Sequence, residues 1–375
     1  MNAINNEFKK SLLTRVKTSI FFAIFIITII LFSAFSDFKD DGFASFLPKW
    51  TRFLFVLLFF LSLIWICYFI AKELCYLYFK FEKKSFLIIY FILLLVSIVL
   101  PSSFLFLSVF KYFNLSLIGD DNKIFAYIYV SILVILPLIC LSILIIFVQN
   151  NNLNLSNFNL KNFPLTFLII SYAFNLIFYI STVWGFASLI CVLAISILSD
   201  VGGLITGVFF GKHKMAPKIS PKKTWEGAIG GQIFSVSILL TFFAIINIYA
   251  DYSNNSNSNL FSRIERNFFG NQFFPGTTLN FHSQQWEWWI IAFFIVLGIG
   301  ISSIFGDLYF SLLKRKNDIK DYANYFPGHG GFLDRIDSWI FAFLFYGFII
   351  ISCSTISSII HANTGWNSIF NYQFV

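Results

Sequence analysis

The sequence predicts an all-α polytopic membrane protein with about nine transmembrane helices and a cytoplasmic N-terminus. Hydrophobic residues make up 58% of the 375 residues, 53 residues are Phe, and the mean hydropathy is +0.79. A soluble domain of this length could not keep so much apolar surface out of water, so most of it must face lipid. The apolar residues form long runs with the basic residues between them, as membrane topology demands.

The apolar runs define the candidate spans, because a helix needs about 20 apolar residues to cross the hydrocarbon core. The nine candidates lie at about residues 19–35, 53–71, 86–107, 124–148, 164–183, 186–211, 227–249, 289–313 and 339–360. The first run lacks a clear small-residue cleavage site, so we expect a span that is not cleaved rather than a signal peptide. The run from residue 163 to 211 is too long for one helix, and we place its turn at Trp184-Gly185.

The distribution of Lys and Arg predicts the orientation. With the N-terminus inside, the cytoplasmic segments carry 19 of the 26 Lys and Arg residues, which is the positive-inside bias. Segments 212–227 and 314–337 are then cytoplasmic loops and 251–283 is an external loop. We divide the chain into residues 1–162, which hold the first four helices, and 163–375, which hold catalytic helices five to nine with both cytoplasmic loops. The expected location is the plasma membrane, with the active site facing the cytoplasm.

The charge distribution and the cysteine spacing argue against a nucleic-acid-binding protein and against a cysteine metal site. The excess of 26 basic over 18 acidic residues lies between apolar runs, so we expect membrane topology and no nucleic-acid partner. The five Cys residues lie in or beside apolar runs without metal-ligand spacing. They are therefore expected to act as small apolar residues.

Two acidic residues, Asp200 and Asp307, lie within the predicted spans. An Asp at mid-membrane costs about 2.5–3.5 kcal/mol, so neither is expected to face lipid. Ser311 and Lys314 follow Asp307 at i+4 and i+7 and would form a polar stripe on one helix face. For a single such Asp, an interhelical hydrogen bond explains the residue as well as a functional site does. Two of them near one face, beside basic loops, favour a functional site.

The first cytoplasmic loop contains SPKKT at residues 220–224. This pattern predicts a helix start, with Ser at the N-cap and Pro at the first helical position. Free N–H groups, two Lys and a Thr hydroxyl at such a start could bind an anion. Taken alone, however, the pattern favours an ordinary capped helix. Glycines spaced four apart at 203, 207 and 211, and again at 227 and 231, predict close helix packing.

The second cytoplasmic loop ends in FPGHGGFLDRIDS, residues 326–338. Its glycines could bring backbone N–H groups close to a ligand. Asp334 and Asp337 lie one helical turn apart, where carboxylates could simply cap a helix, and a lone His329 is more often a hydrogen-bonded structural group. A hard divalent cation, however, takes carboxylate oxygens and substrate phosphates. Asp307 and Asp334 could supply such a site, so phosphate chemistry is the favoured interpretation.

Three stretches near the C-terminus carry a family resemblance. SLLKR (311–315), KD (320–321) and FPGHGGFLDRID (326–337) together resemble the C-terminal motif of the phosphatidate cytidylyltransferases, the CDP-diacylglycerol synthases. SPKKTWEG (220–227) and the helix of Asp200 also resemble that family. The resemblance covers about residues 185–340, and the first four helices and the external loop carry none of it.

The resemblance implies that CTP and phosphatidic acid react to give CDP-diacylglycerol and pyrophosphate at a lipid bilayer. It also implies Mg²⁺, a second monovalent cation such as K⁺, and a homodimer. The metal-binding aspartates of the family correspond to Asp307 and Asp334.

The lipid phosphate already carries a nucleophilic oxygen, so catalysis reduces to positioning and charge neutralisation. In this interpretation Asp307 and Asp334 hold the metal. The residues expected to neutralise phosphates are Lys222, Lys223, Lys314, Arg315 and Arg335. Those expected to orient substrates are Ser220, Thr224, Glu226, Ser311, His329, Gly330 and Gly331, with Asp200 and Asp337 as second choices.

The alternatives are two other enzymes and, from a different class of protein, a transporter. A CTP-dependent polyprenol or phytol kinase would have to deprotonate an alcohol, so a poised base would matter more. An ion-coupled transporter could place Asp200 and Asp307 on an ion path, with broken helices and an internal repeat, and the sequence contains no such repeat. A CDP-alcohol phosphotransferase is disfavoured because its DGxxAR pattern is absent.

Overall fold

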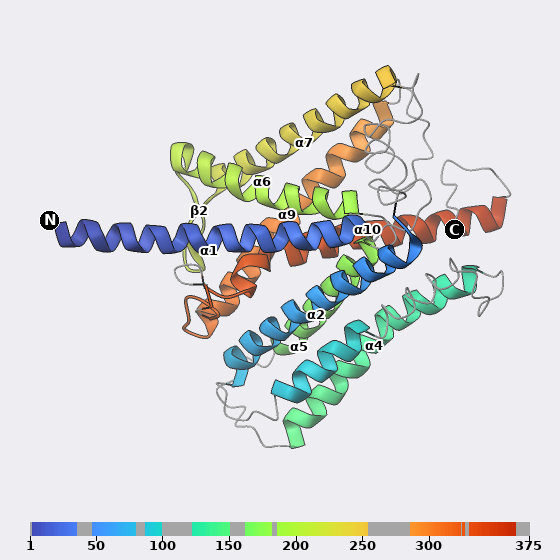
Figure 1. Cartoon of the computed structure of the whole chain (residues 1–375), viewed down its shortest axis with the longest axis horizontal. Helices are drawn as coiled ribbons and strands as arrows, with labels where there is room; N and C mark the ends of the chain where they lie inside the picture. Colours follow the sequence, from blue (N-terminus) through green and yellow to red (C-terminus); the bar gives the residue numbers. More distant parts are fainter. Residues whose placement is uncertain are drawn as a thin grey trace.

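The structure is a computed structural model that describes residues 2–35, 47–79, 87–99, 122–150, 162–181, 186–253, 286–323, 325–326 and 330–364. Its helices are α1 (Asn2–Phe35), α2 (Lys49–Phe79), Leu87–Val99, α4 (Asn122–Asn150), α5 (Asn162–Tyr179), α6 (Phe186–Phe210), α7 (Trp225–Ser253), α9 (Trp286–Lys316) and α10 (Leu333–Thr364). In Figure 1, α6 and α7 occupy the upper part of the view and α2, α4 and α5 the lower part, with α1 crossing between them. Because α10 packs against α9, α5 and α6, it joins the two parts.

The all-α membrane fold predicted from the sequence is confirmed. Each of the nine predicted spans falls on a helix, as far as the described residues reach. Among those residues, six helices are long and apolar enough to cross a membrane: α2, α5, α6, α7, α9 and α10. The apolar parts of α1, Leu87–Val99 and α4 are shorter. The Trp184-Gly185 turn, residues 254–283 of the external loop, and His329 lie outside the described residues.

The close packing predicted from the glycine spacing is confirmed between α6 and α7. A Cβ added to Gly227 would lie 2.8 Å from the Gly203 carbonyl oxygen, and one added to Gly231 would lie 2.4 Å from that of Ser199. Real Cβ atoms do not approach backbone so closely, so these positions accept only glycine without a shift. The end of α6 is thereby held against the start of α7, and the segment that connects them is brought to the same end of both helices.

That connecting segment is a β-hairpin, so the predicted helix start at Ser220 is wrong. Strand β1 (Lys214–Ala216) pairs antiparallel with β2 (Ser220–Thr224). A turn with Pro217 at its second position joins them, closed by the Ile219 N–H on the Ala216 carbonyl at 3.1 Å. The fixed φ of Pro221, which follows Ser220, is compatible with an edge strand as well as with a first helical turn. Pairing with β1 decides in favour of the strand.

The segment between α9 and α10 is shorter than the predicted loop 314–337. Helix α9 continues to Lys316, and α10 begins at Leu333. The last turn of α9 therefore carries three basic residues and the first turn of α10 carries Asp334. Both arrangements suit the helix dipole, which favours cations at the C-terminus and anions at the N-terminus.

Candidate active site

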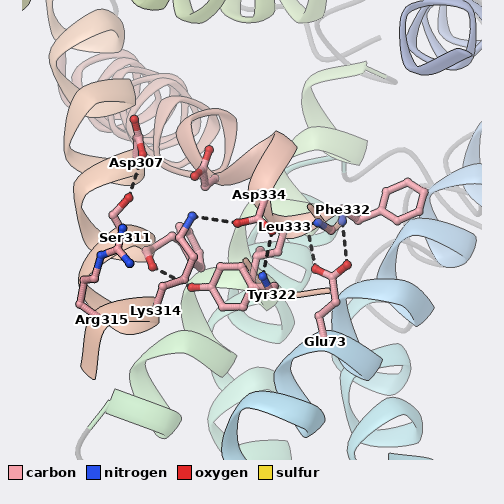
Figure 2. A network of polar contacts seen from close by, with 12 residues as sticks. Glu73, Asp307, Ser311, Lys314, Arg315, Tyr322, Phe332, Leu333 and Asp334 are labelled. Carbon is pink, nitrogen blue, oxygen red and sulfur yellow. Dashed lines mark hydrogen bonds and ion pairs between the residues drawn. The ribbon is translucent and has the colours of Figure 1, made fainter. Parts of the chain in front are cut away.

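One face of α9 carries the predicted polar stripe at the end of the helix. The Ser311 hydroxyl donates a hydrogen bond to Asp307 Oδ1 at 3.1 Å, one helical turn away. Lys314 and Arg315 follow in the last turn, and Figure 2 shows these four side chains along α9. The i, i+4, i+7 spacing therefore places a carboxylate, a hydroxyl and a cation in a row.

The hairpin brings a second cation to this stripe. Lys223 of β2 forms an ion pair with Asp307, with Nζ 2.5 Å from Oδ2. Arg315 Nε donates to the Ile219 carbonyl at the hairpin turn at 3.3 Å. The two segments that the sequence placed in separate cytoplasmic loops therefore meet, and Lys223 and Asp307 lie together as candidate phosphate and metal groups.

Asp334 lies at the start of α10 and connects three segments. Its Oδ1 accepts a hydrogen bond from Lys314 Nζ at 2.8 Å. Its Oδ2 accepts the N–H groups of Tyr322 at 2.9 Å and Gly331 at 2.8 Å. The Lys314 and Asp334 side chains are 13% and 7% exposed, so this pair is largely removed from water. Asp334 thus both pairs with a site lysine and shapes the turn.

Tyr322 contacts both the backbone of α9 and the side chain of Lys314. Its hydroxyl donates to the Phe310 carbonyl of α9 at 2.8 Å, and Lys314 Nζ lies 5.4 Å from the centre of its ring. Burial raises the pKa of Tyr322 well above its usual value. The phenol therefore stays neutral and keeps its proton for the hydrogen bond.

Glu73 of α2 is a site residue that the sequence analysis missed. Its Oε1 accepts the Phe332 N–H at 2.7 Å and its Oε2 accepts the Leu333 N–H at 2.8 Å, so it caps α10 from another helix (Figure 2). The statement that the spans hold only two acidic residues is therefore wrong, because Glu73 lies within the apolar segment Trp50–Tyr78. The available signal was an acidic residue two positions beyond the predicted end of the span at residue 71.

Asp200 and Asp337 approach the same region. Asp200 of α6 lies within electrostatic range of Lys223 and Asp307 and within reach of the Ser338 hydroxyl. Asp337 of α10 is 8% exposed, accepts the Ser338 N–H at 2.8 Å, and lies within electrostatic range of Asp307 and Asp200. Three carboxylates from three helices therefore gather beside the hairpin.

Two predicted substrate groups have structural partners. Thr224 Oγ1 accepts the Gly227 N–H at 3.1 Å, so it is the N-cap of α7 in place of Ser220. Glu226 accepts the Lys212 and His213 N–H groups, both at 3.1 Å to Oε2, and the His213 ring, with Nδ1 2.5 Å from Oε1. Both residues thereby fix the base of the hairpin.

The remaining predicted residues are placed as follows. Ser220 and Lys222 lie on β2, where Lys222 is exposed. Arg335 is half-buried in the first turn of α10. Gly330 has a φ of 81°, which favours glycine, and its carbonyl accepts the Phe326 N–H at 3.0 Å.

The carboxylates fit a magnesium ion by donor type and capacity. Magnesium takes oxygen ligands and commonly uses one or two carboxylates, with waters and substrate phosphates completing its shell. A carboxylate oxygen has two lone pairs. Each oxygen of Asp307 and Oδ1 of Asp334 accept one hydrogen bond or ion pair and keep a lone pair for a metal ion, whereas Asp334 Oδ2 already accepts two N–H groups. Within the described part of the chain, no three His, Cys, Asp or Glu side chains form a metal-binding cluster.

The geometry can be compared with known proteins. Residues 5–353 match the sequence profile of the cytidylyltransferase family. This chain belongs to the cytidylyltransferase family. The match extends over the N-terminal helices, so the expectation that the first four helices carry no resemblance is wrong, and the resemblance seen in the C-terminal motif is confirmed.

Curated relatives of this family member resemble a part of the chain. A phosphatidate cytidylyltransferase of Haemophilus influenzae is 35% identical over 152 residues, which are 40% of this chain and 41% of the relative. That of Rickettsia bellii is 36% identical over 141 residues, 38% of this chain and 48% of the relative. That of Helicobacter pylori is 32% identical over 180 residues, 48% of this chain and 53% of the relative. The chain spans about half the length of these relatives.

The two lysine–aspartate pairs of this family member should differ in their contribution to stability. Lys314→Met leaves the buried Asp334 without its cation and should destabilise the fold by about 3–5 kcal/mol. Lys223→Met affects a pair whose side chains are 24% and 28% exposed and should cost at most about 1 kcal/mol. Thermal unfolding of both variants in one detergent measures the difference.

The unsubstituted protein and the two variants share the same membrane spans, so detergent effects cancel in this comparison. Equal losses of melting temperature in Lys314→Met and Lys223→Met would contradict the burial argument.

Proposed function

We propose that this chain transfers CMP from CTP to phosphatidic acid, forming CDP-diacylglycerol and pyrophosphate. The proposal is supported by the family and by the activity for which the relatives are named. The observation that carries it is the meeting of Lys223 with Asp307 and of Lys314 with Asp334 at one end of the helices. Cations and carboxylates from three separate elements are what a reaction between two phosphates requires.

The reaction forms one bond and breaks one. A phosphate oxygen of phosphatidic acid bonds to the α-phosphorus of CTP, and the bond from that phosphorus to the α,β-bridging oxygen breaks, so pyrophosphate leaves. No strong base is needed, because the attacking oxygen is already ionised. Lys223 and Lys314 neutralise phosphate oxygens, and Arg315 and Lys222 lie beside them on α9 and β2. Ser311 orients Asp307 through its hydrogen bond.

The metal assignment is part of the proposal. Asp307 and Asp334 would hold Mg²⁺, which supplies further neutralisation of the triphosphate when bound. The lysine that each aspartate now carries would then be released toward phosphate oxygens. Asp200 and Asp337 would keep the lysines oriented. The second monovalent cation such as K⁺ and the homodimer implied by the resemblance stay predictions.

The proposed topology has nine spans, a cytoplasmic N-terminus and a plasma-membrane location. The nucleotide then reaches the site from the cytoplasm and the lipid from the bilayer. The excess of Lys and Arg in the segments assigned to the cytoplasm supports this orientation.

The function predicts the fate of each CTP phosphate. Purified protein with Mg²⁺, phosphatidic acid and CTP labelled at the α-phosphorus should form labelled CDP-diacylglycerol and release unlabelled pyrophosphate. Excess chelator should abolish turnover, and zinc should not restore it, because the ligands are carboxylates without a Cys or His cluster among the described residues. Transfer of a γ-phosphate label to a lipid alcohol would instead indicate a kinase, and full turnover in chelator would refute the metal assignment.

The charges of Asp307 and Asp334 should be essential. Asp307→Asn and Asp334→Asn keep the size and much of the hydrogen bonding but remove the charge that a metal needs. We expect each to lose nearly all CMP transfer, on the order of 100-fold or more, while the protein still accumulates in membranes. Initial rates over a range of Mg²⁺ and CTP concentrations measure the loss.

Asp318→Asn is the matched control for this pair. Asp318 is exposed in the segment that connects α9 to α10. It has a φ of 55°, a conformation that Asn also adopts. Its variant should keep its rate within about twofold. Near-normal rates in both site variants would end the two-aspartate metal assignment.

The topology predicts which side of the membrane reaches each segment. A single Cys placed at Asn317 should be protected from a membrane-impermeant maleimide applied to intact cells, because Asn317 follows the basic end of α9. A Cys at Asn257, in the predicted external loop, should be labelled. The reverse labelling pattern would overturn both the orientation and the cytoplasmic entry of the nucleotide.

A further inference from the structure

The backbone of the glycine-rich turn is held by carboxylates from two helices. The consecutive N–H groups of Gly331, Phe332 and Leu333 all donate to carboxylate oxygens. Asp334 accepts the first, and Glu73 accepts the other two. The first N–H groups of a helix have no partner within the helix, and a negative acceptor there is favourable. Two N–H groups at the start of α10 therefore donate to a carboxylate that lies 259 and 260 positions away in the sequence.

The contact between Glu73 and the turn leaves little room for movement. The Glu73 side chain is buried, at 1% exposure, and a Cβ added to Gly331 would lie 2.3 Å from its Oε1. Two aromatic rings of the same helix also pack on Phe332, with centroid distances of 4.9 Å from Phe69 and 5.4 Å from Trp65. Helix α2 therefore holds the turn by both hydrogen bonds and ring packing.

This contact is linked to the reacting region through one residue. Phe332 and Leu333 directly precede Asp334, whose Oδ1 binds Lys314. A displacement of the two N–H groups would move the Asp334 carboxylate, and the Lys314 ammonium would move with it. Displacements of about 1 Å in catalytic groups can cost on the order of 100-fold in rate. The hydrogen bonds of Glu73 go to backbone groups, so its influence on the reaction passes through this pair.

We propose that Glu73 is a positioning residue of the site, which fixes the Asp334–Lys314 pair by holding the start of α10. The inference rests on the proposed function for its activity measurement. It assigns a role to the N-terminal helices, because α2 lies outside the C-terminal motif. A role limited to folding predicts lower yield or melting temperature, with normal kinetics in the protein that remains folded.

The test compares Glu73→Gln with the unsubstituted protein. Glutamine has one acceptor oxygen and an amide group that cannot accept the second N–H. We expect kcat for CMP transfer to fall about 10- to 100-fold. KM for CTP should change by less than about threefold, because the lysine and arginine side chains proposed to bind the nucleotide phosphates lie on the hairpin and α9, which Glu73 does not contact through these hydrogen bonds. Hydrogen–deuterium exchange of a peptide that contains residues 330–335 should be about tenfold faster at the 332 and 333 amides.

Tyr78→Phe is the matched control on the same helix. Tyr78 is buried, and its hydroxyl lies 3.2 Å from Thr166 Oγ1 of α5. Loss of this hydroxyl therefore removes a buried polar contact between α2 and α5 and leaves the two hydrogen bonds of Glu73 in place. This variant should keep kcat and the exchange of the 330–335 peptide within about twofold of the unsubstituted protein.

A double-mutant cycle isolates the contact itself. Gly331→Ala should lower kcat in the unsubstituted background, because the added Cβ collides with Glu73. In a Glu73→Ala background, Gly331→Ala should lower the logarithm of kcat by less than about half as much, because the effects of substitutions at residues in contact are not additive. If Glu73→Ala folds poorly, the separate comparisons of Glu73→Gln and Gly331→Ala with the unsubstituted protein replace the cycle.

The outcomes separate the two proposals. An unsubstituted protein that transfers no CMP refutes the proposed function. A protein that transfers CMP normally, with kcat or turn exchange in Glu73→Gln equal to those of Tyr78→Phe, overturns the positioning role alone. Strict additivity in the cycle likewise overturns it. A joint fall in kcat and rise in exchange, with KM nearly constant, supports it.

Discussion

A carboxylate removed from water needs an ammonium group or polarised N–H groups beside it, and the polar end of this protein is organised by that requirement. Asp334 accepts Lys314 and two backbone N–H groups, and Glu73 accepts two more. An isolated buried carboxylate would cost several kcal/mol. Each bond that offsets this cost also ties together segments that are distant in the sequence, so the same interactions build the site and the fold around it.

The hairpin shows how packing far from the charges places them. Glycines at the interface allow α6 and α7 to approach until their backbones are in contact. The 11 residues of β1, the turn and β2, residues 214–224, must then connect the two helix ends over a short distance. Glu226 and Thr224 fix its base, which leaves Lys223 facing Asp307. A lysine is useful in phosphate chemistry only when its position is fixed, and this position depends on small residues within the membrane.

The N-terminal helices contribute to the same site. Two aromatic rings of α2 pack on Phe332 of the turn. Phe22 of α1 packs against Phe326 and Trp339, and Lys72 lies 5.2 Å from the centre of the Tyr325 ring. The division of the chain into N-terminal helices and a catalytic remainder therefore describes the position of the motifs. It does not describe which residues support them.

Composition and periodicity alone determined the fold class, the helix positions and the residues on one face of α9. These features are local: hydropathy depends on neighbouring residues, and the stripe from Asp307 to Lys314 follows from 3.6 residues per turn. The tertiary structure decided which charges meet. Ser220 has every local mark of an N-cap, yet strand pairing across the hairpin moves the cap to Thr224. Glu73 was missed because its partners are N–H groups 259 and 260 positions away, and no local pattern reports a hydrogen bond that only helix packing creates.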